Sequence, residues 1–101
     1  MTSALIVLIN YGTDLSSRTT GAGIRVAIRN MLAHATESVT VDCTGIRTLS
    51  ESFADELFGV LVAEKGKPWF RKHVQVTGMT DSTRGAILRA IDARLNTLSV
   101  E

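Results

Sequence analysis

The chain has 101 residues, of which 45% are hydrophobic and 21% are charged, and it contains a single proline. This composition excludes a disordered, collagen-like or coiled-coil protein and predicts one globular domain over residues 1–101. Eleven Lys and Arg residues stand against ten Asp and Glu residues, a net charge of +1. The chain as a whole therefore has no strong field to attract nucleic acid or an anionic membrane.

The sequence does not require an oxidising compartment, because the single cysteine, Cys43, has no partner for an internal disulfide. Residues 4–9 form an apolar run that is too short to cross a membrane and lacks the basic flank of a signal peptide. We therefore expect a soluble, cytoplasmic protein. His34 and His73 have no other ligand at metal-site spacing, so we expect neither a metal nor a cofactor.

Three short apolar segments are typical of buried strands. Residues 4–9 are continuously apolar and end at the turn signal Asn10-Tyr11-Gly12. Residues 39–41 end at Asp42, and residues 74–77 end at Gly78. Because the first segment is apolar at every position, we expect a sheet that is covered on both faces.

Three helical patterns separate and follow these strands. The first pattern places five apolar residues on one face: Ile24, Ile28, Met31, Leu32 and Ala35. The second begins near residues 50–52 and buries Phe53, Leu57 and Leu61. The third opens at the capping pair Thr80-Asp81 and aligns Ile87, Leu88, Ile91, Leu95 and Leu98.

The alternation of strands and helices predicts a small α/β domain. We expect a mixed, largely parallel sheet of three to four strands, joined by right-handed crossovers and flanked by about three helices.

Polar side chains gather where the middle strand passes into the second helix. The first turns of this helix carry Ser50, Glu51, Ser52 and Asp55. In open α/β sheets, ligands and partners meet the carboxyl ends of the strands. The simpler interpretation is that Ser50 or Ser52 caps the helix, which would still leave the serine exposed. No set of nucleophile, base and orienting group is evident, so we expect a binding role and no enzymatic activity.

The second helix is apolar over more of its circumference than a single sheet-facing stripe requires. Phe53, Leu57 and Leu61 form the inward stripe, whereas Phe58, Gly59 and Val62 fall on or near the opposite side. An apolar patch with a polar rim is typical of a docking surface. The predicted partner-binding residues are therefore Ser50, Glu51, Ser52, Asp55, Phe58, Gly59 and Val62. The alternative is that Phe58 packs under a neighbouring helix.

Residues 20–26 begin like a dinucleotide-binding fingerprint, with Gly21 and Gly23. The third small residue is replaced by Val26, and the segment begins about eleven residues after the first strand. A helix with permissive glycines explains this segment better.

Residues 65–73 form a loop-like segment in which basic side chains surround Trp69 and Phe70. Such a segment can hold phosphates and stack a base, so a nucleic-acid-associated adaptor is the alternative function. More often the aromatic rings anchor such a loop while the lysines are solvated.

The junction also resembles a known family, the STAS-like domains of unknown function, which are relatives of the bacterial anti-sigma factor antagonists. The resemblance lies in the strand ending at Asp42, the loop Gly45-Ile46, and the segment Ser-Phe-Ala-Asp-Glu-Leu-Phe-Gly at residues 52–59. Ser17-Arg18, Gly21 and Ile24-Arg25 resemble the first helix of that family. Together these features cover most of residues 16–62.

The resemblance implies a non-enzymatic regulatory module whose partner is a histidine-kinase-like ATPase. In anti-sigma factor antagonists such a kinase phosphorylates a Ser or Thr within an Asp-Ser-Ser/Thr-Gly pattern at this junction. Without gaps, that pattern falls on residues 50–53 and puts Glu51 at the acceptor position, where its carboxylate mimics a phosphate or marks a lost switch. A shift of one residue makes Ser50 or Ser52 the acceptor. Cys43 replaces the usual aromatic residue after the strand. A homodimer is also compatible with an exposed Phe58.

Overall fold

Three parallel strands form the main sheet. The computed structural model describes residues 2–34 and 36–99, with side chains as far as residue 96. The strand order is β1 (Ser3–Val7), β3 (Ser38–Asp42), β5 (Val74–Thr77). The three predicted strands are confirmed, although β1 ends at Val7 and the chain turns through a 3-10 segment, η1 (Leu8–Tyr11). Leu8 points into the core from this turn and is fully buried.

A second, smaller sheet pairs β2 (Asp14–Leu15) with β4 (Thr48–Leu49), also in parallel. The carboxylate of Asp14 accepts hydrogen bonds from the Arg47 guanidinium and the Thr48 hydroxyl. This pair of short strands ties the start of α1 to the start of the second helix. The α/β class and the largely parallel pairing are therefore confirmed.

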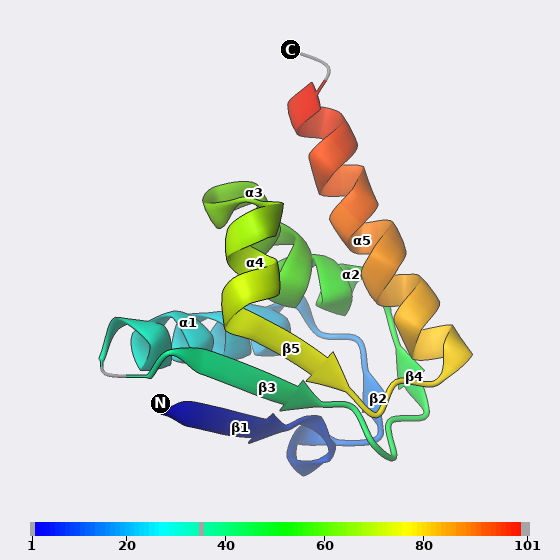
Figure 1. Cartoon of the computed structure of the whole chain (residues 1–101). Coiled ribbons are helices and arrows are strands. Elements are labelled where there is room, and N and C mark those ends of the chain that lie inside the picture. The colour runs from blue at the N-terminus through cyan, green and yellow to red at the C-terminus, as the bar shows by residue number, and fades with distance from the viewer. Residues whose placement is uncertain (1, 35, 100–101) are drawn as a thin grey trace.

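Helices cover only one face of the main sheet, and the expectation of cover on both faces is wrong. The covered face carries Ala4, Ile6, Val39, Val41, Val74 and Val76. On the opposite face, Leu5 is 61% exposed and pairs in register with Thr40, which in turn pairs with Gln75. When the strand order advances in one direction and the crossovers share one hand, the helices collect on one side. Figure 1 shows them gathered above and behind the sheet.

Each of the three predicted helices forms. The first is α1 (Arg18–Ala33), where the Ser17 hydroxyl caps the helix by accepting from the Thr20 N–H at 3.2 Å. The last is α5 (Asp81–Ser99), which begins with reciprocal hydrogen bonds between Thr80 and Thr83.

The predicted inner faces of these two helices are largely correct. Ile24, Ile28, Ile87 and Ile91 are buried. Leu88 is the exception, because its side chain is exposed on the outer face of α5. Ala35 and the Leu98 side chain lie outside the described residues.

The middle helix is continuous from residue 51 to residue 65, and we call it the central helix. It consists of α2 (Glu51–Ala54), a π-helical segment η2 (Asp55–Gly59) and α3 (Val60–Lys65). It ends at Gly66, whose φ of 91° places it in the left-handed region that favours glycine.

The segment predicted as a basic loop is a short helix, α4 (Lys67–His73). Pro68 lies in its first turn, where a missing N–H costs nothing and the fixed φ suits the helix. Phe70 anchors α4 to the core, because its ring meets that of Phe58 edge to face at 6.1 Å.

Two glycines allow neighbouring helices to approach the central helix closely. A Cβ on Gly21 of α1 would lie 2.9 Å from the Phe53 carbonyl oxygen. A Cβ on Gly59 would lie 3.3 Å from the Ala90 carbonyl oxygen of α5. The central helix is therefore held tightly between α1 and α5, as their positions in Figure 1 indicate.

We predict that Gly21→Ala destabilises the protein by about 1–3 kcal/mol, because the new methyl group meets a backbone atom that cannot move aside. Gly23→Ala is the matched control on the same helix, since nothing lies within 4 Å of its added Cβ. We expect that control to gain about 0.5–1 kcal/mol from its higher helix propensity. Urea unfolding of both variants measures the difference, and equal effects would contradict the close contact.

Candidate functional site

Ser50 is the cap of the central helix, as the simpler interpretation predicts. Its hydroxyl oxygen accepts a hydrogen bond from the Phe53 N–H at 3.0 Å. The same hydroxyl donates to the Ser16 carbonyl at 3.4 Å, and the Ser50 N–H donates to the Leu15 carbonyl at 2.9 Å. The Ser50 hydroxyl is therefore engaged in fixing the junction.

Glu51 and Ser52 occupy the first turn of the central helix and differ in their contacts. The Glu51 side chain is 59% exposed and is ion-paired with Arg89 of α5. Ser52 is partly exposed, and among the described residues its hydroxyl has no hydrogen-bond partner. Of the two candidate acceptors, Ser52 thus has the available hydroxyl.

Asp55 and Glu56 hold the central helix to both of its neighbours. The Asp55 carboxylate receives a forked pair of hydrogen bonds from Arg94 of α5, at 2.7 and 2.8 Å, and one from Arg18 of α1 at 3.1 Å. Glu56 accepts from Arg18 and from Arg25, each at 3.0 Å. Arg25 also donates to the Glu56 carbonyl oxygen. Paired in this way, the two acids act as links between three helices.

These contacts lower the pKa of both carboxyls. For Asp55 the hydrogen bonds from Arg94 are the largest cause, and they outweigh a burial that raises the pKa. For Glu56 the largest cause is the hydrogen bond from Arg25. Because the Asp55 side chain is only 18% exposed and already shared by two arginines, it is not displayed for a partner.

The predicted exposure of Phe58, Gly59 and Val62 is wrong. Phe58 and Val62 are 0% exposed, and Gly59 is also buried. The alternative is correct, because Phe58 packs against Phe70 of α4. The central helix is apolar on nearly all sides since it contacts α1, α4 and α5 as well as the core. These three residues therefore do not form a docking surface.

The sequence does not identify the arginines that pair with Asp55 and Glu56. Arg18, Arg25 and Arg94 lie 31 to 39 residues from the acids that they contact. The signal that points to them is the acid pair Asp55-Glu56 inside an apolar helix, because carboxylates in such a place need cations or donors nearby.

The thiol of Cys43 and the glycine-rich start of α1 are both parts of the packed core. Cys43 is buried, and burial together with the charge of Asp42 raises the pKa of its thiol to about 11, so it is a packed side chain and no nucleophile. Gly21, from the dinucleotide-like segment, lies inside α1 against Phe53. Within residues 2–34 and 36–99, no group of three or more His, Cys, Asp or Glu side chains could hold a metal ion.

We predict that Asp55→Asn lowers stability by about 1–3 kcal/mol at pH 7, because it removes the charge that Arg94 and Arg18 share. The pKa of Asp55 is lower in the folded state, so its contribution is complete above about pH 4 and is lost as the pH falls through the lowered pKa. Chemical denaturation at several pH values measures this. Glu51→Gln, which breaks an exposed pair, is the control and should cost less. A difference between wild type and Asp55→Asn that widens on acidification would contradict the assignment.

In the part of the chain that the structure describes, no helix is long and apolar enough to cross a membrane.

Comparison with known proteins agrees with the α/β architecture. No curated protein and no solved structure matches the chain. A sequence profile described as a STAS-like domain of unknown function matches residues 20–84, which run from the first turn of α1 through the central helix and β5 to the first turn of α5. The chain therefore belongs to the family of STAS-like domains of unknown function.

Proposed function

We propose that this domain is a non-enzymatic regulatory module that binds a protein partner through the exposed first turn of its central helix. The partner that the resemblance to anti-sigma factor antagonists favours is a histidine-kinase-like ATPase. The observation that carries the proposal is Ser52, a partly exposed hydroxyl without a partner among the described residues, in a first turn whose neighbouring acids are each paired with an arginine.

The helix turn places Ser52 beside the acid pair. Residues three and four positions apart share a helix face, so Ser52 lies next to Asp55 and Glu56. Both carboxylates bind Arg18, whose side chain is 55% exposed. A phosphoryl group on Ser52 would compete for Arg18 and add about two negative charges to this surface. It would also be compatible with the helix, because the N-terminus of a helix favours negative charge.

Buried side chains behind the exposed turn confine the effect of such a charge to the surface. Phe53 and Leu57 are fully buried directly behind the exposed turn. A charge added at Ser52 therefore alters what a partner meets on the surface and leaves the core in place. Exposed charges of this kind act on partner choice and association rate.

The variant Ser52→Asp tests the proposal with the histidine-kinase-like ATPase encoded nearest to this protein. We expect wild type and Ser52→Ala to bind that ATPase equally and Ser52→Asp to bind at least about tenfold more weakly, because the added charge repels the docked partner. Isothermal titration calorimetry measures the affinities.

Ser82→Asp is the matched control, since Ser82 is exposed at the equivalent second position of α5. Its affinity should stay within about twofold of the wild-type value. Absence of binding by the wild-type protein would refute this partner, and equal losses for Ser52→Asp and Ser82→Asp would refute the docking surface. Mass spectrometry after incubation with the ATPase and ATP shows whether Ser52 receives the phosphoryl group.

A further inference from the structure

The cations that lack an acidic partner are concentrated on one short stretch of the chain. Six Arg side chains form ion pairs with Asp or Glu: Arg18, Arg25, Arg29, Arg47, Arg89 and Arg94. Among the described residues, the remaining five cations have no such pair: Lys65, Lys67, Arg71, Lys72 and Arg84. Four of these five lie within eight residues, at the end of α3 and along α4.

The fold turns this stretch outward. Phe70 is the inward anchor of α4, so Lys67, Arg71 and Lys72 are exposed on the other sides of the helix. Residues 64–73 contain four cations and one acid, a net charge of +3, whereas the rest of the chain has seven cations and nine acids, a net charge of −2. The net charge of +1 therefore conceals a local positive surface on α4.

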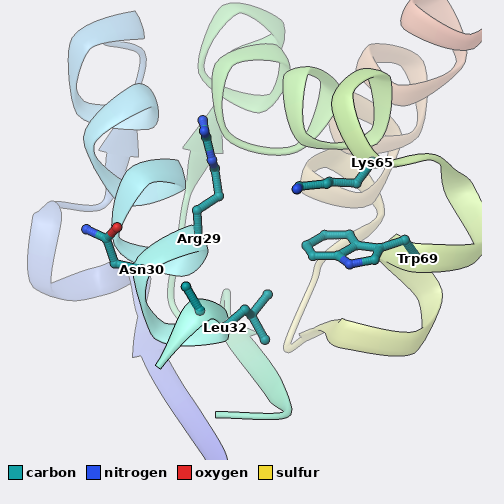
Figure 2. A pocket seen from close by; sticks show the side chains of 6 residues that line it. Arg29, Asn30, Leu32, Lys65 and Trp69 are labelled. Atoms are coloured by element: carbon teal, nitrogen blue, oxygen red, sulfur yellow. The ribbon is translucent and has the colours of Figure 1, made fainter. Parts of the chain in front are cut away.

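A cavity of about 380 Å³ lies between the last turns of α1 and the start of α4. Figure 2 shows the Lys65 amine extending across the Trp69 indole toward α1, with Arg29 on the opposite wall. The Lys65 Nζ atom lies 5.8 Å from the centre of the Trp69 ring. Arg29 also forms an exposed ion pair with Glu64. The cavity thus combines a partly exposed aromatic ring with two cations.

A second hollow, of about 670 Å³, lies at the C-terminal end of α4, beside the first residues of β1 and β3. Lys72, His73 and Gln75 contribute to its wall, and Glu37 is the acid that lines it. The Trp69 and His73 rings are adjacent, with centroids 5.0 Å apart, and so connect the two hollows. A ligand that passes from the first hollow along these two rings reaches Lys72 at the second hollow. Lys67 and Arg71 are exposed on the outer side of α4, because they lie two positions from Trp69 along the helix.

We propose that α4 and its two flanking hollows bind single-stranded nucleic acid. An unstacked base fits the cavity against the Trp69 indole, in the place over the ring that Lys65 now occupies, while Arg29 and Lys65 meet the adjacent phosphate. Beyond the second hollow the strand passes Lys72 and turns onto the outer side of α4, where Arg71 and Lys67 hold the phosphates that follow. The cations outside the cavity favour an extended strand over a mononucleotide, and the need to stack a free base favours a single strand over a duplex.

Binding of a fluorescein-labelled oligo(U) of about ten nucleotides tests the proposal. Fluorescence anisotropy measures the affinity in KCl from about 25 to 200 mM, because binding to phosphates weakens as the salt concentration rises. We expect the combined variant Lys67→Gln, Arg71→Gln, Lys72→Gln to bind at least about tenfold more weakly, and its log–log salt slope to be smaller by about 2, since each lost phosphate contact on a single strand removes about 0.7. Arg84→Gln is the matched control, because it removes an exposed, unpaired cation on α5. Equal losses in the two variants, or no binding by the wild type at the lowest salt, would overturn the proposal.

Trp69 supplies a second readout, because it is the only tryptophan in the chain. Stacking of a base should quench its fluorescence on addition of unlabelled oligo(U), and Trp69→Phe should retain the fold but bind more weakly. Binding without quenching would overturn the placement of the base. Uridine monophosphate that binds as tightly as the oligonucleotide would show that α4 contributes nothing, and would overturn the extended strand. Circular dichroism of each variant confirms that a loss of binding is not a loss of fold.

Discussion

Burial of the central helix on nearly every side is the constraint around which the rest of the domain is arranged. Phe53 and Leu57 share one face of this helix and Phe58 lies on another, and all three side chains are fully enclosed. Enclosure requires close neighbours, which Gly21 of α1 and Gly59 of the helix itself permit. It also requires that the acids at its edge be neutralised, which the arginines of α1 and α5 accomplish. Packing and ion pairing thus support the same arrangement of helices.

This arrangement separates two surfaces of different character. The start of the central helix displays Glu51 and Ser52 beside an acid pair that is already linked to arginines. Its other end leads into α4, where cations without acidic partners surround Trp69. Both surfaces are anchored to the core, the first by Phe53 and the second by Phe70, so a ligand at either one meets side chains whose positions are set by packing. The uncovered face of the sheet, with Leu5 exposed, is a third region and follows from the one-directional strand order.

The sequence predicts the secondary structure and the helix caps correctly where residues close in the chain determine them. The three strands of the main sheet, the Ser50 cap and the Thr80-Asp81 helix start each depend on a few adjacent residues, and the sequence predicts each of them correctly. The error at Phe58 and Val62 arose because a helical wheel shows which residues share a face but not how many neighbours the helix has. The error at residues 67–73 arose because a proline and a run of basic residues suggest a loop, whereas Phe70 inserts into the core and stabilises a helical turn.

By itself the sequence determined the α/β class, the resemblance to STAS-like domains and the place of the serine-rich junction, since periodicity and capping act over a few residues. Only the tertiary structure decided which residues of that junction remain available. Asp55 is taken up by Arg94, 39 positions away, and Phe58 is covered by a helix that follows it. It also decided which cations stay unpaired on α4. Contacts between distant segments follow from chain topology and packing, and the local pattern of residues does not encode them.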